Sequence, residues 1–123
     1  MNNAILYDVK EYIGLNPDEE DTTMDGSITM FINSAMDDLA RIGLGQLGGF
    51  RLETKAETWD EYLSDEQKFL LSSVKSYISI YTRLHFDTPQ SSLQSALEEQ
   101  LRKLEFTIQT AIELKDESES PAL

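Results

Sequence analysis

Residues 65–114 read DEQKFLLSSVKSYISIYTRLHFDTPQSSLQSALEEQLRKLEFTIQTAIEL. Apolar side chains recur in both halves at alternating spacings of three and four, the pattern of one buried face of an α-helix. These positions are Leu70, Val74, Tyr77, Ile78, Tyr81 and Leu84, and then Leu97, Leu101, Leu104, Ile108 and Ala111. Pro89 excludes a continuous helix through the middle. The stretch therefore predicts an antiparallel helical hairpin, with helices over residues 65–86 and 92–114.

Two further helices are predicted upstream of the hairpin. The first carries Ile5, Val9, Tyr12 and Ile13 on one face, with Asn3 as its N-cap and Gly14 as the residue that ends it. The second spans residues 23–42, with Gly43 and Gly45 at its end. Its apolar face comprises Ile28, Phe31, Ile32, Ala35, Leu39 and Ile42.

The connection between the second and third helices is rich in glycine. We predict a mobile loop over residues 44–58, with a possible small hairpin at residues 50–52. Thr58 and Glu61 have the spacing of a capping box, which predicts one short helical turn after Thr58. Ser64 and Gln67 repeat that spacing, so we expect a second box to open the long third helix.

These elements predict an all-α fold, a small bundle of about four helices. A single domain would occupy residues 1–114, and the polar residues 115–123 would form an acidic tail, disordered in isolation. The predicted core comprises Ile5, Val9, Ile28, Ile32, Leu39, Leu70, Val74, Ile78, Leu97, Leu101, Leu104 and Ile108.

Composition excludes several classes of function. The 123-residue chain has a net charge of −13, which disfavours a wide nucleic-acid interface and adsorption to anionic membranes. It contains no cysteine, so disulfides, cysteine zinc sites and thiol nucleophiles are ruled out. No stretch approaches 18 consecutive apolar residues, so we expect no membrane-spanning helix.

No motif predicts catalysis, a cofactor or a metal, so we expect a protein that is not an enzyme. The lone histidine, His85, has no nucleophile in a recognisable setting, and interaction with its helix end is the favoured interpretation. Asp21, Thr23, Asp25 and Gly26 match the start of a calcium loop, but Ile32 stands where that loop needs a bidentate carboxylate. The remaining acid clusters are interpreted as solvated helix faces.

Surplus apolar residues point instead to protein contacts. Tyr7, Leu47, Phe50, Trp59, Tyr62 and Phe106 fall outside the predicted core stripes. Charge is also uneven, with nine acids and two bases in residues 1–50 but six acids and five bases in residues 51–86. The candidate protein-contact residues are Phe50, Trp59, Tyr62, Phe86, Asp87, Pro89, Asp116, Glu117 and Leu123.

The order of these motifs resembles the head–tail connector, or adaptor, proteins of long-tailed bacteriophages. The matching pieces are DVKEY at 8–12, Asp25-x-x-Ile28, Trp59-x-x-Tyr62-Leu63, Val74-Lys75-x-Tyr77-Ile78, RLHFDTPQSS at 83–92 and LEF at 104–106. Thr88 departs from the Asp-Pro-Pro that the family favours, and Phe106-Thr107 stands where the family often has Trp-Arg.

The resemblance implies a structural virion protein made in the bacterial host cytoplasm. Such proteins form a ring, expected to be a dodecamer, that contacts the portal protein, neighbouring copies and the next neck or tail-completion protein. DNA would pass through the channel without specific binding, and no membrane would be involved. Alternatives are another neck component, an acidic DNA-mimic inhibitor that occupies a nucleic-acid-binding enzyme, and a small helical interaction module.

Overall fold

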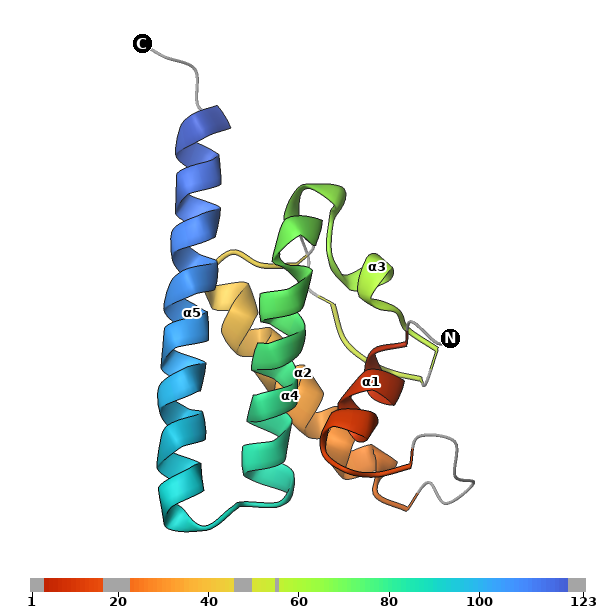
Figure 1. Cartoon of the computed structure of the whole chain (residues 1–123). Helices are drawn as coiled ribbons and strands as arrows, with labels where there is room; N and C mark the ends of the chain where they lie inside the picture. Colours follow the sequence, from red (N-terminus) through yellow and green to blue (C-terminus); the bar gives the residue numbers. More distant parts are fainter. Residues whose placement is uncertain (1–3, 17–22, 46–49, 55, 120–123) are drawn as a thin grey trace.

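The computed structural model describes residues 4–16, 23–45, 50–54 and 56–119 (Figure 1). Its elements are α1 (Ile5–Tyr12), α2 (Asp25–Arg41), α3 (Trp59–Tyr62), the 3₁₀-helix η1 (Asp65–Leu70), α4 (Leu71–Phe86) and α5 (Ser91–Glu119). The described residues contain no strand, and the one β-bridge among them joins Ala4 to Thr58. The predicted all-α class is therefore confirmed, with five α-helices in the described part rather than about four.

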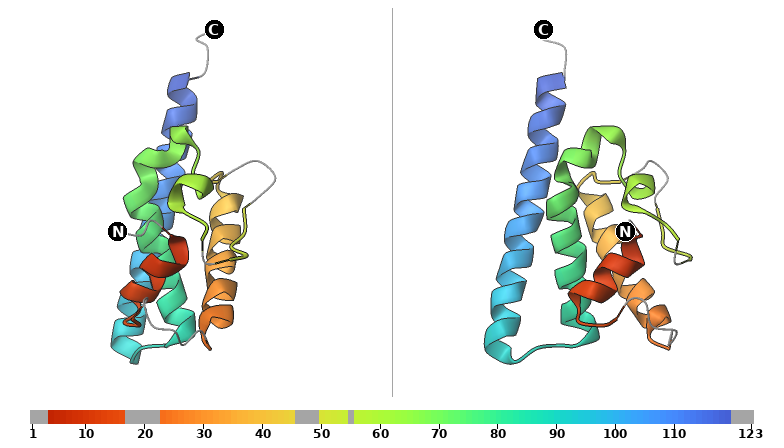
Figure 2. Two further views of the ribbon diagram at one scale, coloured as in Figure 1. Left: turned by 90° about the vertical axis from the view of Figure 1, so that its right-hand side faces the viewer. Right: turned by 45° about the vertical axis from the view of Figure 1, so that its right-hand side comes forward.

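Helix α4 lies at the centre of the molecule. It packs against α2 and α5 along most of its length, and against α1 more briefly. Helices α4 and α5 lie side by side and run in opposite directions, joined by a short turn (Figures 1 and 2). The C-terminal part of α5 extends beyond the other helices in every view.

Helices α1 and α2 end at the glycines that the sequence predicted. Gly14 has φ +89°, and the N–H groups of Gly14 and Leu15 donate to the last carbonyls of α1. Gly43 has φ +98° directly after α2. Both glycines adopt the left-handed conformation that ends helices and that other residues adopt only with strain. The predicted N-cap, Asn3, lies outside the described residues.

Residues 50–54, which follow α2 in the chain, are held against that helix. Leu52 is buried, and its backbone N–H and carbonyl both pair with the side-chain amide of Asn33, at 2.7 and 3.1 Å. A helix side chain therefore satisfies both of these backbone groups, and residues 50–54 and 56–58 contain no strand. Residues 46–49 lie outside the described part.

One of the two expected capping boxes forms. Thr58 accepts from the N–H of Glu61 and the Glu61 carboxylate accepts from the N–H of Thr58, which confirms the first box. At Ser64 neither half of the box forms. The backbone N–H of Gln67 donates to the Ser64 carbonyl at 2.9 Å, and the Gln67 side-chain amide accepts from the N–H of Gly45 and donates to the carbonyl of Gly43. A 3₁₀-helix therefore precedes α4, and the long helix begins at Leu71.

Helix α5 is longer than predicted at its C-terminal end. It continues to Glu119, five residues past the expected end at Leu114, so the first part of the predicted tail is helical. The added residues include Lys and Glu, which are good helix formers, and the first helix breaker is Pro121. Residues 120–123 are outside the described part.

The core is close to the predicted set but larger. Ten of its twelve predicted members are buried, while Leu101 and Leu104 are half-buried and pack against the core from α5. The principal addition is the segment around α3, which contributes Trp59, Tyr62 and Leu63.

Candidate protein-interaction surface

The described residues offer no constellation for metal binding. No three metal-ligating side chains come together in that part of the chain. Asp25, one of the positions considered for a calcium loop, is 8% exposed and bonds the Lys10 ammonium at 2.8 Å. Ile32 lies in the core. Asp25 therefore joins α1 to the start of α2 as half of a buried ion pair.

His85 belongs to an aromatic stack on the surface. Its ring lies 4.2 Å from that of Tyr81 and 5.7 Å from that of Phe31, measured between centroids. Its Nδ1 is 2.8 Å from the carbonyl oxygen of Tyr81, one helical turn earlier. The histidine thus interacts with the last turn of α4, as its favoured interpretation expected.

Trp59 and Tyr62 are buried within the chain, so their assignment as protein-contact residues is wrong. They are 1% and 2% exposed. The Trp59 Nε1–H donates to the Asp8 carboxylate at 2.7 Å, and the Lys75 ammonium lies 3.3 Å from that carboxylate and 5.5 Å from the indole centroid. The Trp59 side chain thus lies between α1 and α4, whereas the Tyr62 ring lies beside Phe50 and Gly45.

Four of the other candidates are at least partly accessible, and three of them lie together at the turn between α4 and α5. Phe50 is half-buried, with its ring 5.4 Å from that of Tyr62. Phe86 and Pro89 are half-buried and Asp87 is exposed, all at the turn between α4 and α5. In that turn the N–H of Asp87 donates to the carbonyl of Arg83 at 3.0 Å, which places Asp87 as the C-cap of α4.

The three C-terminal candidates belong to the end of α5 or follow it. Asp116 and Glu117 have helical backbone within α5. Leu123 lies outside the described residues. The candidate set therefore does not form one surface within the described part of the chain.

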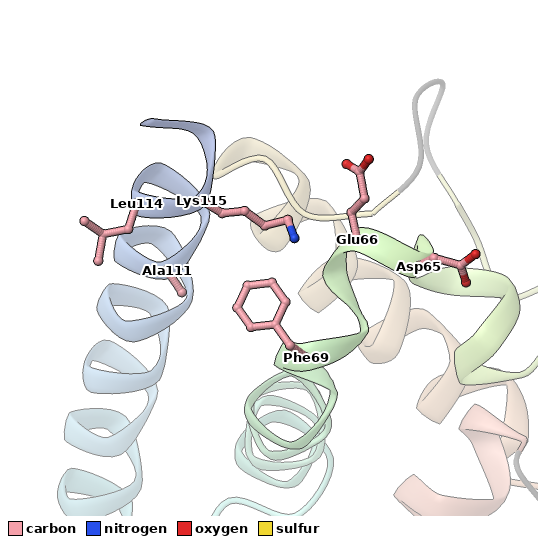
Figure 3. A pocket seen from close by; sticks show the side chains of 6 residues that line it. All are labelled: Asp65, Glu66, Phe69, Ala111, Leu114 and Lys115. Atoms are coloured by element: carbon pink, nitrogen blue, oxygen red, sulfur yellow. The ribbon is translucent and has the colours of Figure 1, made fainter. Parts of the chain in front are cut away.

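An apolar groove that the sequence did not predict lies between η1 and the C-terminal part of α5 (Figure 3). Its volume is about 590 Å³, and its lining comprises Asp65, Glu66, Phe69, Ala111, Leu114 and Lys115. We call it the Phe69 groove. Phe69 is 58% exposed, with the Lys115 ammonium 5.3 Å from its ring centroid. Phe69 lies outside the apolar stripe of α4, and this position was the sequence signal for its exposure.

The outer face of α5 presents a second apolar feature. Phe106 is 70% exposed, the highest value among the large apolar side chains of the described part. It lies on α5 between Leu104 and Ile108, which face the core. This confirms that Phe106 lies outside the core stripes. Exposed aromatic side chains of this kind are typical of protein-contact surfaces.

An acidic groove follows the other side of the α4–α5 pair. Its volume is about 510 Å³, and its charged lining residues are Asp38 of α2 and Glu98, Arg102 and Glu105 of α5, three carboxylates to one guanidinium. Tyr77 and Tyr81 of α4 also line it. Burial raises the pKa of the Tyr77 hydroxyl, and the negative charges of Asp38 and Glu105 raise it further. The groove therefore has a negative potential.

Comparison with known proteins gives one match. The family model described as phage connector protein matches residues 5–115, which include α1 to α4 and most of α5. No curated protein and no solved structure matches the chain. None of the described helices is long and apolar enough to cross a membrane.

Proposed function

The chain belongs to the phage connector protein family, and from this we propose that it is a subunit of a ring at the head–tail junction of the virion. The ring would sit under the portal, extend the DNA channel and dock the next neck or tail-completion protein. The observation that carries the proposal is the extent of the family match, from residue 5 to residue 115.

The surface of the molecule supports a role in assembly. Phe69, Phe106 and Leu114 are more than half exposed, and all three lie on or beside α5. A chain that acts through contacts with other proteins keeps such side chains accessible until its partners cover them.

The charge of the protein suits a DNA channel. A net charge of −13 repels the phosphate backbone, so DNA passes through the ring without specific binding. The acidic groove on α2, α4 and α5 supplies part of this negative field. The same charge keeps free subunits apart in solution before assembly.

Assembly would use three kinds of contact. The partners are the portal protein, neighbouring copies in a ring of expected twelve-fold symmetry, and the following neck or tail-completion protein. The subunits would be made in the bacterial host cytoplasm and end in the virion. We assign the C-terminal residues, with Asp116, Glu117 and Leu123, to an arm that reaches the portal or a neighbouring copy.

The arm has a direct test. Deleting residues 116–123 removes the last turn of α5 and everything after it, and it keeps every core residue that the structure describes. We expect the truncated chain to keep its helical circular dichroism spectrum and to bind the portal much more weakly. Unchanged portal binding would show that the arm does not make this contact.

The function itself is tested by binding to the portal ring encoded in the same genome. The two purified proteins are co-sedimented and the complex is imaged by electron microscopy. We expect a ring of this protein stacked on the outer end of the portal. Absence of binding with both partners folded would contradict the connector role and favour an acidic DNA-mimic inhibitor.

A further inference from the structure

The Phe69 groove is an open apolar hollow with room for a large side chain of a partner. Phe69 forms its floor and points toward α5, with Ala111 on the facing side and the Lys115 side chain across the top (Figure 3). Leu114, 60% exposed, marks the outer edge. The exposed apolar surface here would be stabilised by burial against an apolar partner.

The groove also has an acidic rim. Glu66 projects from η1 on the side of the groove that faces Lys115 (Figure 3). Glu66 is exposed and forms no ion pair with the described residues, whereas its neighbour Asp65 pairs with Lys68 at 2.8 Å. A carboxylate in this position favours a partner that carries a cation beside its apolar group.

The outer face of α5 carries such a pair of side chains. Phe106 and Lys103 are three residues apart, so they are neighbours on the helix surface. Phe106 is 70% exposed. Lys103 is exposed, and its charge acts on Glu99 one turn earlier, although the hydrogen bond to Glu99 comes from Arg102.

Phe106 cannot reach the groove of its own chain. At 100° per residue, Phe106 lies on the opposite side of α5 from Lys115 and well away from Ala111. A rigid helix cannot bring its outer face against its inner face, so only a different molecule can bring a Phe106 and a Lys103 to the groove.

We propose that Phe106 of one copy inserts into the Phe69 groove of the next copy, with Lys103 beside it reaching Glu66. This contact would join neighbouring copies in the proposed ring, so it rests on the proposed function. It joins two different surfaces of the same chain, so it is heterologous. Each copy has one exposed Phe106 side chain and one Phe69 groove. When the rotation between successive copies adds up to a full turn, repetition of the contact produces a ring.

The absence of native cysteine allows a clean test by disulfide trapping. Glu66→Cys and Lys103→Cys are made in separate full-length chains of different tag length, and both chains keep Phe106 and Phe69. The two are mixed in equal amounts at high concentration and oxidised, without portal. The control is Met30→Cys, which is 57% exposed on α2, mixed with each of the two.

The expected product is the Glu66→Cys/Lys103→Cys heterodimer, several-fold more abundant than either homodimer and than any Met30→Cys pair. Adding Phe106→Asp to the Lys103→Cys chain should reduce the heterodimer to the control level. Because Phe106 is exposed, that variant should keep the thermal unfolding midpoint of its parent. A heterodimer yield no higher than the controls, or unaffected by Phe106→Asp, overturns the contact.

A charge exchange in otherwise native chains gives a second readout. Lys103→Glu should weaken ring formation on the portal, and Glu66→Lys in the same chain should restore it, because each new pair again has opposite charges. Failure of the double variant to recover, with both variants folded, contradicts the pairing.

The two proposals fail in different ways. A chain that binds the portal but does not give the trapped heterodimer keeps its connector role and loses this contact. A chain that gives the heterodimer but does not bind the portal keeps the contact between copies and loses the connector role.

Discussion

The body formed by α1 to α4 and the helix α5 are built differently. Within the body, α1, α2, α3 and α4 each contribute side chains with almost no exposure, among them Ile5, Ile28, Trp59 and Ile78. In α5, which is the longest helix described, Ile108 is the one fully buried large side chain among residues 91–115. Its principal neighbour is α4, and its outer face carries the exposed Phe106.

The body is also tied together by polar contacts between distant residues. Lys10 pairs with Asp25, Asp8 accepts from Trp59, and the Asn33 amide pairs with the backbone of Leu52. The described ion pair within α5, between Arg102 and Glu99, is local and exposed. The body is therefore stabilised by contacts among its own elements, whereas α5 packs against the body with one face and leaves its other faces accessible to partners.

The largest loss of stability should follow removal of the Trp59 side chain from the body. Trp59→Ala leaves a large cavity between α1 and α4, and we expect it to lower the free energy of unfolding by about 3–5 kcal/mol. Urea unfolding followed by circular dichroism measures the change. Trp59→Phe, which keeps an aromatic ring but loses the donor to Asp8, should cost less. Equal stability of wild type and Trp59→Ala would show that α3 does not belong to the core.

The buried ion pair is the next most sensitive point. Lys10→Met leaves the Asp25 carboxylate buried without its cation, and we expect a loss of about 3–5 kcal/mol. The double variant Lys10→Met, Asp25→Leu removes both charges and should regain most of that stability. The same urea titration measures both. A double variant as unstable as the single one would mean that the pair is needed for more than mutual neutralisation.

Two positions on α5 compare a buried and an exposed side chain within one helix. Ile108→Ala removes a fully buried side chain and should cost about 2–5 kcal/mol. Phe106→Ala, two residues away, changes an exposed position and should shift stability by no more than about 0.5 kcal/mol. Thermal unfolding of both variants tests this. A large loss for Phe106→Ala would contradict the placement of this side chain on the outer face.

The smallest effect concerns acid stability of the loop before α3. Partial burial raises the pKa of the Glu57 carboxyl, but hydrogen bonds from the N–H of Glu53 and from Thr54 outweigh it, so its pKa lies below the ordinary 4.5. A depressed pKa adds stability above the ordinary value, and this is lost as the pH falls through the folded-state pKa.

Glu57→Gln removes that titration. We expect the variant to be slightly less stable than wild type at neutral pH, with the difference shrinking as the solution is acidified below the ordinary pKa of 4.5. Urea midpoints of both chains across this range give the difference. A gap that is constant with pH would show that Glu57 contributes nothing through its charge.

Much of the helical framework could be predicted because its signals are local. The apolar stripes of α4 and α5, the glycines after α1 and α2, and the Thr58 capping box each depend on residues within a few positions of one another. Pro89 also placed the end of α4 near Phe86, where the structure has it.

The interaction surface was harder to predict because it depends on tertiary packing. Trp59 and Tyr62 belong to one helical turn with no stripe of its own, so their burial depends on where the body places α3. Gln67 matched a capping box but bonds Gly43 and Gly45, residues more than twenty positions earlier. The Phe69 groove needs η1 beside the far end of α5, which no local pattern indicates.

The most direct test of this division between body and α5 is an electron cryo-microscopy map of the protein assembled on its portal. We predict a closed ring in which α1 to α4 keep the fold described above. The outer face of α5 in each copy should lie in the Phe69 groove of its neighbour. A ring whose copies touch through α1 and α2 and leave Phe106 in solvent would contradict it.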